Sequence, residues 1–540
     1  MLERSFGMFP GYTALALVGG SSMTYATLQE RIHTTVRGLE HLGVAGGDRV
    51  AILSENMPNW AVAYFAITTM GAVVVPLLPD FSDTEVGNIL EHCDARVVFA
   101  SSTLSPKLPS KRKRRIIGLE NFEGLPDKGS RKKTPRWKEP EEETLAAIIY
   151  TSGTTGKSKG VMLTHKNLVS NAEAARPLAA ANPGECALSI LPLAHTYECT
   201  IGLLAPMSAG MAVYYLGDIP APSILLPALA EVRPHLLLAV PLIIEKIYRG
   251  RVERQLRRSA VLRTALRFPP ARKLLHRATG RRLMKTFGGR LRFFGFGGAP
   301  LAPDVELFLK EAKIPYGIGY GLTETSPLIA ACNPRDQVFR STGFAVEGVE
   351  IRVADPEPRS GEGELQVRGP NVMRGYYLDP DRTNEAFTPD GWFRTGDLGV
   401  VDSRGRVFVK GRLKNVIISS RGENIYPEEL ESVINARSMV VDSIVTSDGA
   451  QLKALVNLDF DLLREHIASQ EGVSADGVSP QRVREETDRY LRKIRAEVNR
   501  ELSSFSHISR FELRSEPFEK TPTMKIKRYL YDDRLQAVQR

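Results

Sequence analysis

The chain has 540 residues, of which 42% are hydrophobic and 25% are charged, and its formal net charge is +10. This composition is ordinary for a soluble globular protein, and the length exceeds the ~250–300 residues at which a single core stops growing, so we expect two or more domains. The four cysteines are scattered, which excludes a CxxC metal site and predicts a reducing compartment, the cytoplasm.

Strand-like and helix-like segments alternate along most of the N-terminal part of the chain. Residues 48–53 and 96–100 are typical of strands, and residues 58–70 are typical of a helix. Such alternation predicts an α/β fold with layered, largely parallel sheets. Residues 105–143 are charged and rich in proline, which favours an exposed loop.

One segment is long and apolar enough to be tested as a membrane span. Residues 61–78 contain no charge over 18 positions, which is the lower limit for crossing a bilayer. Gly71, Pro76 and the β-branched run between them favour a buried helix followed by a buried parallel strand. We therefore predict no transmembrane helix.

Residues 150–160 read YTSGTTGKSKG and follow the apolar, strand-like segment 145–149. A strand that ends in such a loop presents backbone N–H groups, hydroxyls and ammonium groups together, as polyphosphate binding requires. The spacing differs from that of a Walker P-loop, because Thr151 and not glycine stands five positions before Gly156. The loop predicts a site for a nucleotide triphosphate, with a plain surface turn as the alternative, and leaves the chemistry open.

The positive charge is concentrated between residues 249 and 292, where fifteen Lys or Arg residues accompany one acid, Glu253. Leucines, isoleucines and phenylalanines are interleaved roughly at helical spacing. One interpretation is a basic amphipathic surface that meets anionic phospholipid or an acidic protein, and the other is a solvated helical pair that covers a core. Nucleic acid is not expected, because no stacking aromatics or recognition motif accompany the charge.

Two motifs that could form part of a functional site follow this segment. Residues 297–300 (GGAP) come directly after the apolar strand 291–296, and small residues there let a flat ring approach the backbone. Residues 319–327 (GYGLTETSP) place a ring, a hydroxyl and a carboxylate within five positions, at Tyr320, Thr323 and Glu324.

The pattern then changes to short alternating strands with glycine turns, which predicts a small β-rich subdomain over residues 340–410. Within it, residues 391–398 (GWFRTGDL) present Asp397 on a turn. Residues 411–415 (GRLKN) mark a boundary and continue into 419–427. After that boundary we expect a compact α+β unit that includes a charged helix at 481–502.

Taken in order, these segments resemble those of the adenylate-forming superfamily of acyl-CoA synthetases, luciferases and peptide-synthetase adenylation domains, over essentially the whole chain. Residues 191–198 (LPLAHTYE), 289–294 (GRLRFF) and 521–528 (TPTMKIKR) are most similar to bacterial long-chain fatty acyl-CoA synthetases. The resemblance implies a large N-terminal AMP- and acyl-binding domain, residues 1–410, and a small mobile α+β C-terminal domain, residues 411–540.

The resemblance also implies a ligase of fatty acid metabolism that works in two half-reactions. The carboxylate of a fatty acid attacks the α-phosphate of ATP and expels pyrophosphate, and the thiol of CoA then attacks the acyl adenylate. Enzymes of this kind act chiefly by positioning and charge neutralisation. The implied cofactors and substrates are ATP, Mg²⁺ and CoA, with acyl carrier protein as the alternative acceptor.

The family's motifs assign roles to residues of this chain. Tyr320, followed by Gly321, would stack on adenine with Gly298 and Ala299 on its other face, and Asp397 and Arg412 would hold the ribose hydroxyls. Thr323 would contact the α-phosphate, and Glu324 would ligate Mg²⁺, which prefers oxygen ligands. The β- and γ-phosphates would be held by the loop residues Thr151, Ser152, Gly153, Thr154, Thr155 and Lys159.

Four further residues are implied in catalysis and motion. Lys525 matches the family's C-terminal catalytic lysine, which reaches both the carboxylate and the α-phosphate. Lys414 is the implied hinge, and Gly422 lies in the loop that would line the pantetheine channel. His195 matches a position at the mouth of the acyl pocket, where it would gate or orient the carboxylate, unless it is a structural histidine.

Two other functions stay open at the level of sequence. The enzyme would pass the acyl group to carrier protein if the basic segment 249–292 met that acidic partner. In a different class, the chain would be a non-catalytic acyl or nucleotide binding protein. The expected location is cytoplasmic, with peripheral attachment to the inner membrane surface as a further alternative.

Overall fold

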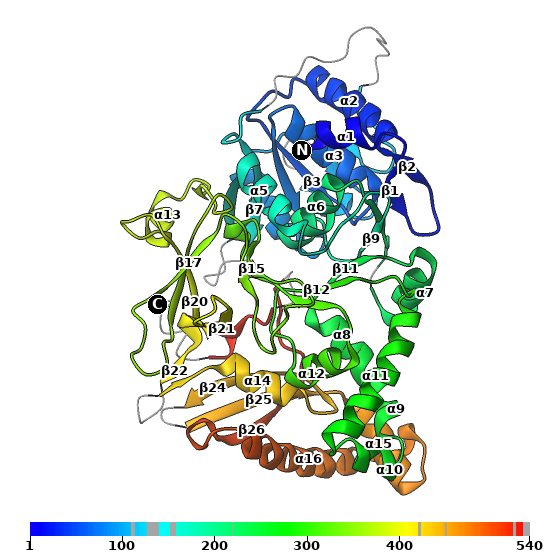
Figure 1. Cartoon of the computed structure of the whole chain (residues 1–540), viewed down its shortest axis with the longest axis vertical. Coiled ribbons are helices and arrows are strands. Elements are labelled where there is room, and N and C mark those ends of the chain that lie inside the picture. Colours follow the sequence, from blue (N-terminus) through cyan, green and yellow to red (C-terminus); the bar gives the residue numbers. More distant parts are fainter. Residues whose placement is uncertain are drawn as a thin grey trace.

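The computed structural model describes residues 1–109, 114–126, 140–151, 158–218, 220–418, 423–448, 451–521 and 525–532. Two seven-stranded sheets with their helices form the larger part of the molecule, an antiparallel β-sheet lies at its side, and the C-terminal elements lie at one end (Figure 1). The mixed α/β class predicted from the sequence is confirmed.

One seven-stranded sheet carries the strand that leads into the predicted phosphate loop. Its order is β19-β8-β7-β4-β3-β5-β6, with parallel pairing from β7 to β6 and antiparallel pairing of β7 with β8 and of β8 with β19. The strands are β3 (Arg49–Leu53), β4 (Val73–Leu77), β5 (Val97–Ala100), β6 (Arg115–Gly118), β7 (Leu145–Thr151), β8 (Lys159–Thr164) and β19 (Gly375–Tyr376).

The uncharged segment 61–78 forms the buried helix and strand that its composition predicts. Helix α3 (Pro58–Thr69) is buried from Asn59 to Thr68, and β4 pairs in parallel with β3. A helix that is apolar on all sides must lie inside the protein or the membrane, and here it lies in the core. Among the described residues no helix is long and apolar enough to span a bilayer.

The region 105–143 is only partly the loop that we predicted. Residues 115–118 form β6, which pairs in parallel with β5 at the sheet edge. Arg115 and Ile116 are exposed there, because an edge strand needs the backbone bonds of only one neighbour. The prediction of a loop was therefore wrong for residues 115–118, where the adjacent lysine- and arginine-rich run led us to expect no strand.

The second seven-stranded sheet has the order β13-β12-β11-β9-β10-β1-β2 and is parallel except for β2. Its strands are β1 (Thr13–Leu17), β2 (Ser22–Thr24), β9 (Cys186–Ser189), β10 (Ala212–Tyr215), β11 (Leu236–Ala239), β12 (Phe293–Phe296) and β13 (Tyr316–Ile318). A single hydrophobic core joins residues of both large sheets, among them Ile52 and Leu188.

Helices cover these sheets and connect their strands. They are α1 (Leu2–Met8), α2 (Tyr25–His41), α4 (Asp83–His92), α5 (His165–Ala175), α6 (Ala205–Ser208), α7 (Pro222–Val232), α8 (Pro241–Ile247), α9 (Arg254–Arg257), α10 (Ala260–Ala265), α11 (Pro269–Thr286), α12 (Pro303–Ala312) and α13 (Pro380–Ala386). Two π-helical segments, Tyr197–Leu204 and Tyr248–Glu253, continue directly into α6 and α9. The basic segment 249–292 is thus helical, as its apolar spacing predicts.

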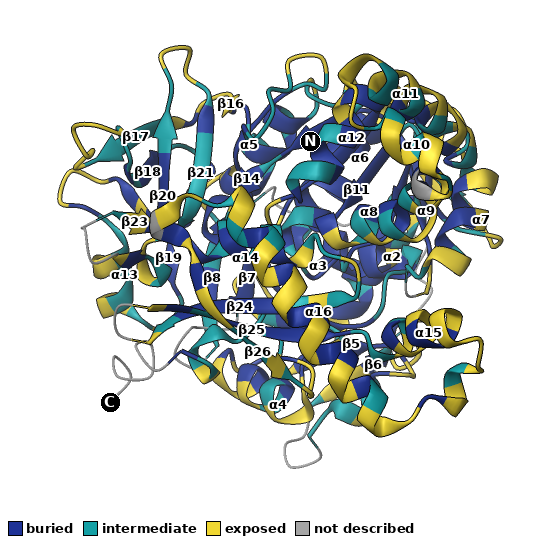
Figure 2. Ribbon diagram, turned by 90° about the horizontal axis from the view of Figure 1, so that it is seen from below, coloured by how far each residue is buried: buried dark blue, intermediate teal, exposed yellow. Residues whose placement is uncertain are grey.

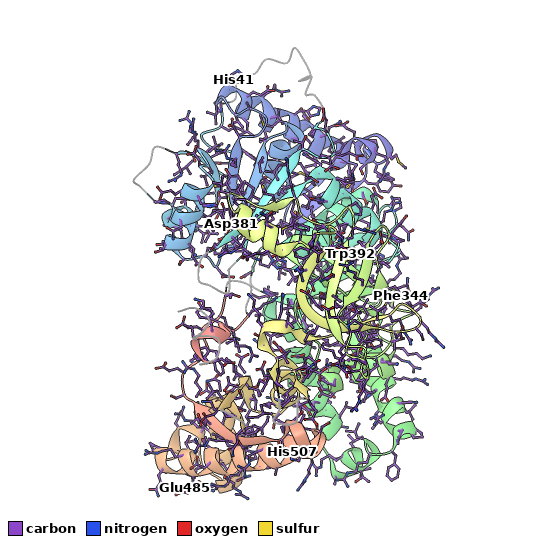
Figure 3. All side chains as sticks on the ribbon, turned by 90° about the vertical axis from the view of Figure 1, so that its left-hand side faces the viewer. His41, Phe344, Asp381, Trp392, Glu485 and His507 are labelled. Atoms are coloured by element: carbon purple, nitrogen blue, oxygen red, sulfur yellow. The ribbon has the colours of Figure 1, made fainter. Side chains whose placement is uncertain are left out.

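The β-rich region predicted after residue 340 is confirmed. Strands β17 (Glu350–Ala354), β18 (Gly363–Arg368), β20 (Phe393–Val401) and β21 (Val407–Arg412) form an antiparallel sheet in that order. A small sheet of β14 (Tyr320–Gly321), β15 (Leu328–Ala331) and β16 (Phe344–Ala345) connects it to the larger sheets. Trp392 and Phe344 lie in this part of the molecule (Figure 3).

The C-terminal elements have a hydrophobic core of their own, formed by residues between Ile417 and Ile508. The elements are β22 (Ile417–Ile418), β23 (Asn424–Ile425), α14 (Pro427–Asn435), β24 (Val440–Asp448), β25 (Gln451–Leu458), α15 (Phe460–Glu471), α16 (Pro480–Glu501) and β26 (Ile508–Arg514). Ser479 caps α16 by accepting the Arg482 N–H, and Pro480 occupies the first turn, where a missing N–H costs nothing. The predicted charged helix is confirmed, and its buried face packs beneath β24–β26 (Figure 2).

Candidate active site

Lys159 and Glu324 meet in the structure although 165 positions separate them. Lys159 opens β8, and its Nζ lies 2.6 Å from Oε1 of the buried Glu324 carboxylate. The hydroxyl of Tyr376, on β19, accepts a bond from Lys159 at 2.8 Å and donates to Glu324 at 2.9 Å. Burial alone would raise the pKa of Glu324, but the Lys159 cation and these hydrogen bonds lower it, so the carboxylate is ionised.

The second cluster joins Asp397, Tyr320 and Arg412. Asp397 on β20 lies opposite Arg412 on β21 in the antiparallel register, and its Oδ1 is 3.0 Å from Nε of Arg412. The Tyr320 hydroxyl donates to Oδ2 at 2.8 Å. Burial raises the pKa of Asp397, whereas Arg412 and Tyr320 favour its charged form. Both carboxylate oxygens are therefore fixed by named donors.

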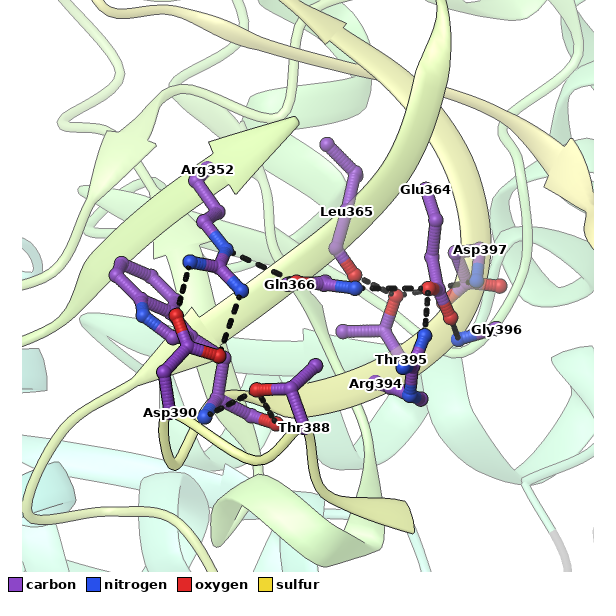
Figure 4. A network of polar contacts seen from close by, with 11 residues as sticks. Arg352, Glu364, Leu365, Gln366, Thr388, Asp390, Arg394, Thr395, Gly396 and Asp397 are labelled. Atoms are coloured by element: carbon purple, nitrogen blue, oxygen red, sulfur yellow. Dashed lines mark hydrogen bonds and ion pairs between the residues drawn. The ribbon is translucent and has the colours of Figure 1, made fainter. Parts of the chain in front are cut away.

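Asp397 lies within strand β20 and not on a turn as the sequence predicts, and a network of polar contacts holds this part of the strand (Figure 4). Glu364 accepts the Gly396 N–H at 3.2 Å, and the Thr395 hydroxyl donates to the Leu365 carbonyl at 2.6 Å and accepts the Asp397 N–H at 3.1 Å. Gly396 has φ +68°, a left-handed conformation that glycine adopts without strain. This part of β20 is thus held by contacts from β18.

Gly298 lies where the sequence predicts a close approach to the backbone, and Gly321 follows Tyr320 in the neighbouring motif. A Cβ at Gly321 would lie 1.8 Å from the Pro327 carbonyl oxygen, so no side chain fits there. Gly298 follows β12 with φ +84°, and it and Ala299 are exposed, so this strand end is open beside the site. Glycine is therefore needed at 321 for space and at 298 for the backbone conformation.

Lys525 comes from the far end of the chain and joins both clusters. The C-terminal segment, red in Figure 1, runs back from the C-terminal sheet towards β21 and β12. Enclosure by protein and the Arg412 cation lower the pKa of Lys525, while Asp397 and Glu324 oppose the shift. The side chain itself is exposed to solvent, so it is not part of the core.

His195 lies beside this group of charges, in the connection between β9 and the π-helix Tyr197–Leu204. Its Nδ1 accepts the Tyr197 N–H at 3.1 Å, which assigns the proton of the neutral ring to Nε2. Burial and the Lys525 charge lower the pKa of His195 to about 4. The imidazole is therefore neutral near pH 7 and can donate a hydrogen bond from Nε2 but cannot serve as a cation.

The remaining predicted residues divide into two groups. Thr151 ends β7 opposite Lys159, Thr323 begins a 3₁₀ turn next to Glu324, and Lys414 is exposed just after β21. The Thr151 hydroxyl is buried and makes no hydrogen bond with the described residues. Ser152, Gly153, Thr154, Thr155 and Gly422 lie outside the residues that the structure describes.

An apolar cavity of about 30 Å³ lies behind the charged clusters. It extends between the π-helix and the sheet strands β11, β12 and β13, and it ends at Gly319, one residue from Tyr320. Its lining includes Tyr197, Leu236, Leu238, Phe293, Gly295 and Ile318. A Cβ at Gly295 would lie 3.3 Å from the Tyr197 hydroxyl, so this tyrosine covers the sheet face beside His195.

Sequence reasoning missed Tyr376 and Glu364. Tyr376 belongs to a two-residue strand, and Glu364 reads as an ordinary polar position of an alternating strand. A signal for Glu364 was present, because the strand next to the predicted ribose-binding carboxylate needs an acceptor for the Gly396 N–H. No comparable signal marks Tyr376, whose role arises from contacts across 217 positions.

The site fits Mg²⁺ in the manner usual for nucleotide enzymes. Mg²⁺ retains several waters and is commonly held by one or two carboxylates together with phosphate oxygens. Glu324 supplies one ionised carboxylate close to the end of the predicted phosphate loop. No group of three or more His, Cys, Asp or Glu suited to a metal occurs in the described part of the chain, so an all-protein cage is not expected there.

Comparisons with known proteins agree with this geometry. A family model described as AMP-binding enzyme matches residues 2–377. The long-chain-fatty-acid–CoA ligase FadD15 of Mycobacterium bovis is 32% identical over 557 aligned positions, which cover 94% of this chain and 90% of the ligase. ATP-bound MatB from Rhodopseudomonas palustris gives a TM-score of 0.76 at 26% identity, covering 100% of this chain and 99% of MatB. The apo form of MatB gives 0.70 at the same identity and coverage.

Proposed function

The chain belongs to the AMP-binding enzyme family, and from that premise we propose that it activates a long-chain fatty acid as acyl-AMP, releases pyrophosphate and transfers the acyl group to CoA. The observation that carries the proposal is that Lys525 interacts electrostatically with members of both ion pairs, Lys159–Glu324 and Asp397–Arg412. The long-chain substrate is supported by the name and the 32% identity of FadD15, which covers nearly the whole chain.

In the first half-reaction the protein would act by positioning and by charge. Asp397 and Arg412 would hold the ribose, the Tyr320 ring would lie against adenine, and the lysine–carboxylate pair of Lys159 and Glu324 would open to receive the phosphates. Lys525 would place its ammonium between the attacking carboxylate and the α-phosphate oxygens, where negative charge increases in the transition state. These roles are proposals that rest on the clustering of the side chains.

Glu324 would hold Mg²⁺, which neutralises phosphate charge when it is bound. This carboxylate is buried and ionised, and its present partner Lys159 is itself a phosphate-binding candidate. We infer that Lys159 stabilises the Glu324 charge until nucleotide arrives and then turns to the phosphates. Tyr376 would keep its hydrogen bond to Glu324 during that exchange and so preserve the orientation of the carboxylate.

The apolar cavity supports an acyl-binding role and also implies movement. A volume of about 30 Å³ is well below the ~300–1,000 Å³ of ordinary ligand pockets, so the cavity must widen to admit a long hydrocarbon chain. Tyr197, on the π-helix, lines the cavity and donates its backbone N–H to His195, and we propose that its side chain moves to open the cavity. The neutral His195 ring would donate from Nε2 to the substrate carboxylate at the cavity mouth.

We propose that residues 411–540 move as a unit about Lys414 between the half-reactions. The arrangement described here suits the first step, because Lys525 faces Arg412, Asp397 and Glu324. The TM-score is higher with ATP-bound MatB, 0.76, than with apo MatB, 0.70. The loop that contains Gly422 would line the pantetheine channel after rotation.

The free cysteines Cys93, Cys186, Cys199 and Cys332 support a cytoplasmic location.

Pyrophosphate release with a panel of medium-chain, long-chain and aromatic acids tests the proposal directly. Release that requires ATP and is fastest with long-chain acids supports it, and a protein that binds acids or ATP without release is a binding protein. Free CoA and acyl carrier protein, titrated separately in a thioester assay, decide between the two acceptors.

A further inference from the structure

We propose that the helical hairpin formed by α10 and α11, together with α9, docks on the surface of an anionic phospholipid bilayer. The hairpin comprises residues 254–286 and contains most of the basic segment found in the sequence. It lies at one edge of the molecule (Figure 1), and large parts of α10 and α11 are exposed when the protein is seen from below (Figure 2). The inference extends the proposed function, because it would bring the enzyme to the phase in which its acid dissolves.

Three large apolar side chains of the hairpin point into solvent. Val261 is 77% exposed, Phe268 is 61% exposed and Leu274 is 69% exposed. Isolated apolar residues are normal on protein surfaces, but several within fourteen positions of one hairpin mark an interaction site. They come in succession from α10, from the residue that precedes α11, and from α11 itself.

Exposed cations alternate with these apolar residues. On α11, the exposed Arg277 and Arg281 stand three and seven positions after Leu274 and so lie on the same helix face, and Lys273 is exposed beside it. Arg254, Arg258, Arg267, Arg282 and Lys285 are also exposed. A face that presents apolar side chains among arginines and lysines matches the boundary of an anionic bilayer, where phosphates and acyl chains alternate within a few ångströms of depth.

The opposite face of α11 fixes the orientation of this surface. His276, Gly280 and Leu283 are buried, and a Cβ at Gly280 would lie 2.6 Å from the Cβ of Ala312 on α12. Arg272 forms an ion pair with Glu311 of α12 at 2.8 Å. Helix α11 is therefore held on α12 by close packing and by charge, and it cannot turn its apolar residues inwards without losing both.

The hairpin is connected to the apolar cavity through the sheet. Strands β11 and β12 are adjacent and parallel, and both line the cavity, through Leu236 and Leu238 on one and Phe293 and Gly295 on the other. The chain between these two strands is the segment that contains the hairpin. A bilayer contact at the hairpin would therefore act on the element that joins two walls of the acyl cavity.

An acidic protein partner is the competing interpretation of the positive charge on the hairpin. The three exposed apolar side chains favour the bilayer instead. A carrier protein would be recognised chiefly by charge, so serine at the three apolar positions would change its binding little. A membrane requires both components, because electrostatic attraction brings the surface close and apolar insertion retains it. Serine at the three apolar positions should therefore weaken binding to a bilayer but leave binding to a carrier protein nearly unchanged.

Co-sedimentation of the full-length protein with vesicles tests the proposal. Binding to phosphatidylcholine vesicles that contain phosphatidylglycerol should exceed binding to pure phosphatidylcholine and should fall with added salt. The triple variant Val261→Ser, Phe268→Ser, Leu274→Ser should lose roughly tenfold or more in vesicle partition. The matched control Met8→Ser, Leu378→Ser, Val473→Ser removes apolar residues that are 62%, 70% and 47% exposed elsewhere, and it should bind like the unaltered protein.

Pyrophosphate release with a detergent-solubilised acid separates this proposal from the proposed function. If the triple variant retains that release, it is folded and its vesicle result stands. If no acid supports release in any variant, the proposed function fails while vesicle binding is still measured. Equal partition of the triple variant and the control would overturn the docking proposal, as would equal binding of the protein to neutral and anionic vesicles.

Discussion

Replacing Lys525 with alanine separates the two half-reactions that we propose. The lysine interacts with Arg412, Asp397 and Glu324 in the arrangement described here, yet it belongs to the C-terminal elements. Its ammonium is the one group of those elements that we place at the α-phosphate. Lys525→Ala should therefore abolish a stabilising charge during adenylate formation and leave the thiol transfer, which follows domain rotation, nearly unchanged.

The size of the effect follows from the kind of interaction lost. Removal of one preorganised donor to a developing oxyanion costs about 3–4 kcal/mol, or roughly 10²–10³ in rate. Arg412 is the neighbouring cation that lowers the pKa of Lys525. It is paired with Asp397 at 3.0 Å, so it should not replace the charge that the substitution removes. Pyrophosphate release in the presence of acid and ATP measures the first step, and thioester formation from supplied acyl-AMP measures the second.

Two neighbouring lysines provide matched controls. Lys520 pairs with Asp442 at 2.7 Å and Lys527 lies 3.6 Å from Glu519, so both cations are engaged within the C-terminal elements. Lys520→Ala and Lys527→Ala should change either rate by less than about fivefold, since such pairs contribute at most ~1 kcal/mol. An equal loss of both half-reactions in Lys525→Ala, or a loss as large in either control, would refute the assignment.

Three further predictions address the rest of the site and the core. Glu324→Gln removes the carboxylate that pairs with Lys159, so pyrophosphate release should fall by roughly 10² and lose its response to a Mg²⁺ titration; an unchanged Mg²⁺ dependence would contradict the metal role. Glu364→Ala leaves the Gly396 N–H without its acceptor, and steady-state kinetics should show KM for ATP raised about fivefold with kcat little changed. Burial raises the pKa of Glu198 to about 8, so the folded state keeps a proton that the unfolded chain loses above its ordinary pKa. Stability should therefore fall by up to about 5 kcal/mol as pH rises towards 8, and Glu198→Gln should flatten this decline in thermal unfolding followed from pH 5 to 9; parallel curves for the two proteins would contradict a protonated Glu198.

Much of the fold was predictable because its signals are local. The helix and strand within residues 58–78, the strand at 145–151 and the charged helix α16 each follow from periodicity over a short window. The strand β6 did not follow, because it lies at a sheet edge and its residues 115 and 116 are exposed beside a basic run. Its stability comes from pairing with β5, which no local pattern records.

The candidate site was predictable as a set of residue types but not as a set of contacts. Glycines, Lys159, Glu324, Asp397 and Arg412 were identified from motifs whose chemistry suits a nucleotide. Their partners were not, because Tyr376 reaches Lys159 across 217 positions and Glu364 reaches the Gly396 N–H across 32. Side chains that position a ligand-binding group need no motif of their own; they need only the right place on a neighbouring strand.

The sequence by itself therefore determined the residues on which the proposed chemistry depends: a candidate phosphate loop, a carboxylate proposed to bind a hard cation, a proposed ribose-binding pair and a lysine near the C-terminus. Only the tertiary structure decided which charges face one another, how large the apolar cavity is and which side of the basic helices faces solvent. The physical reason is the range of each effect. Backbone preference and amphipathic period act over a few residues, whereas electrostatic pairing and close packing depend on distances that the whole fold sets.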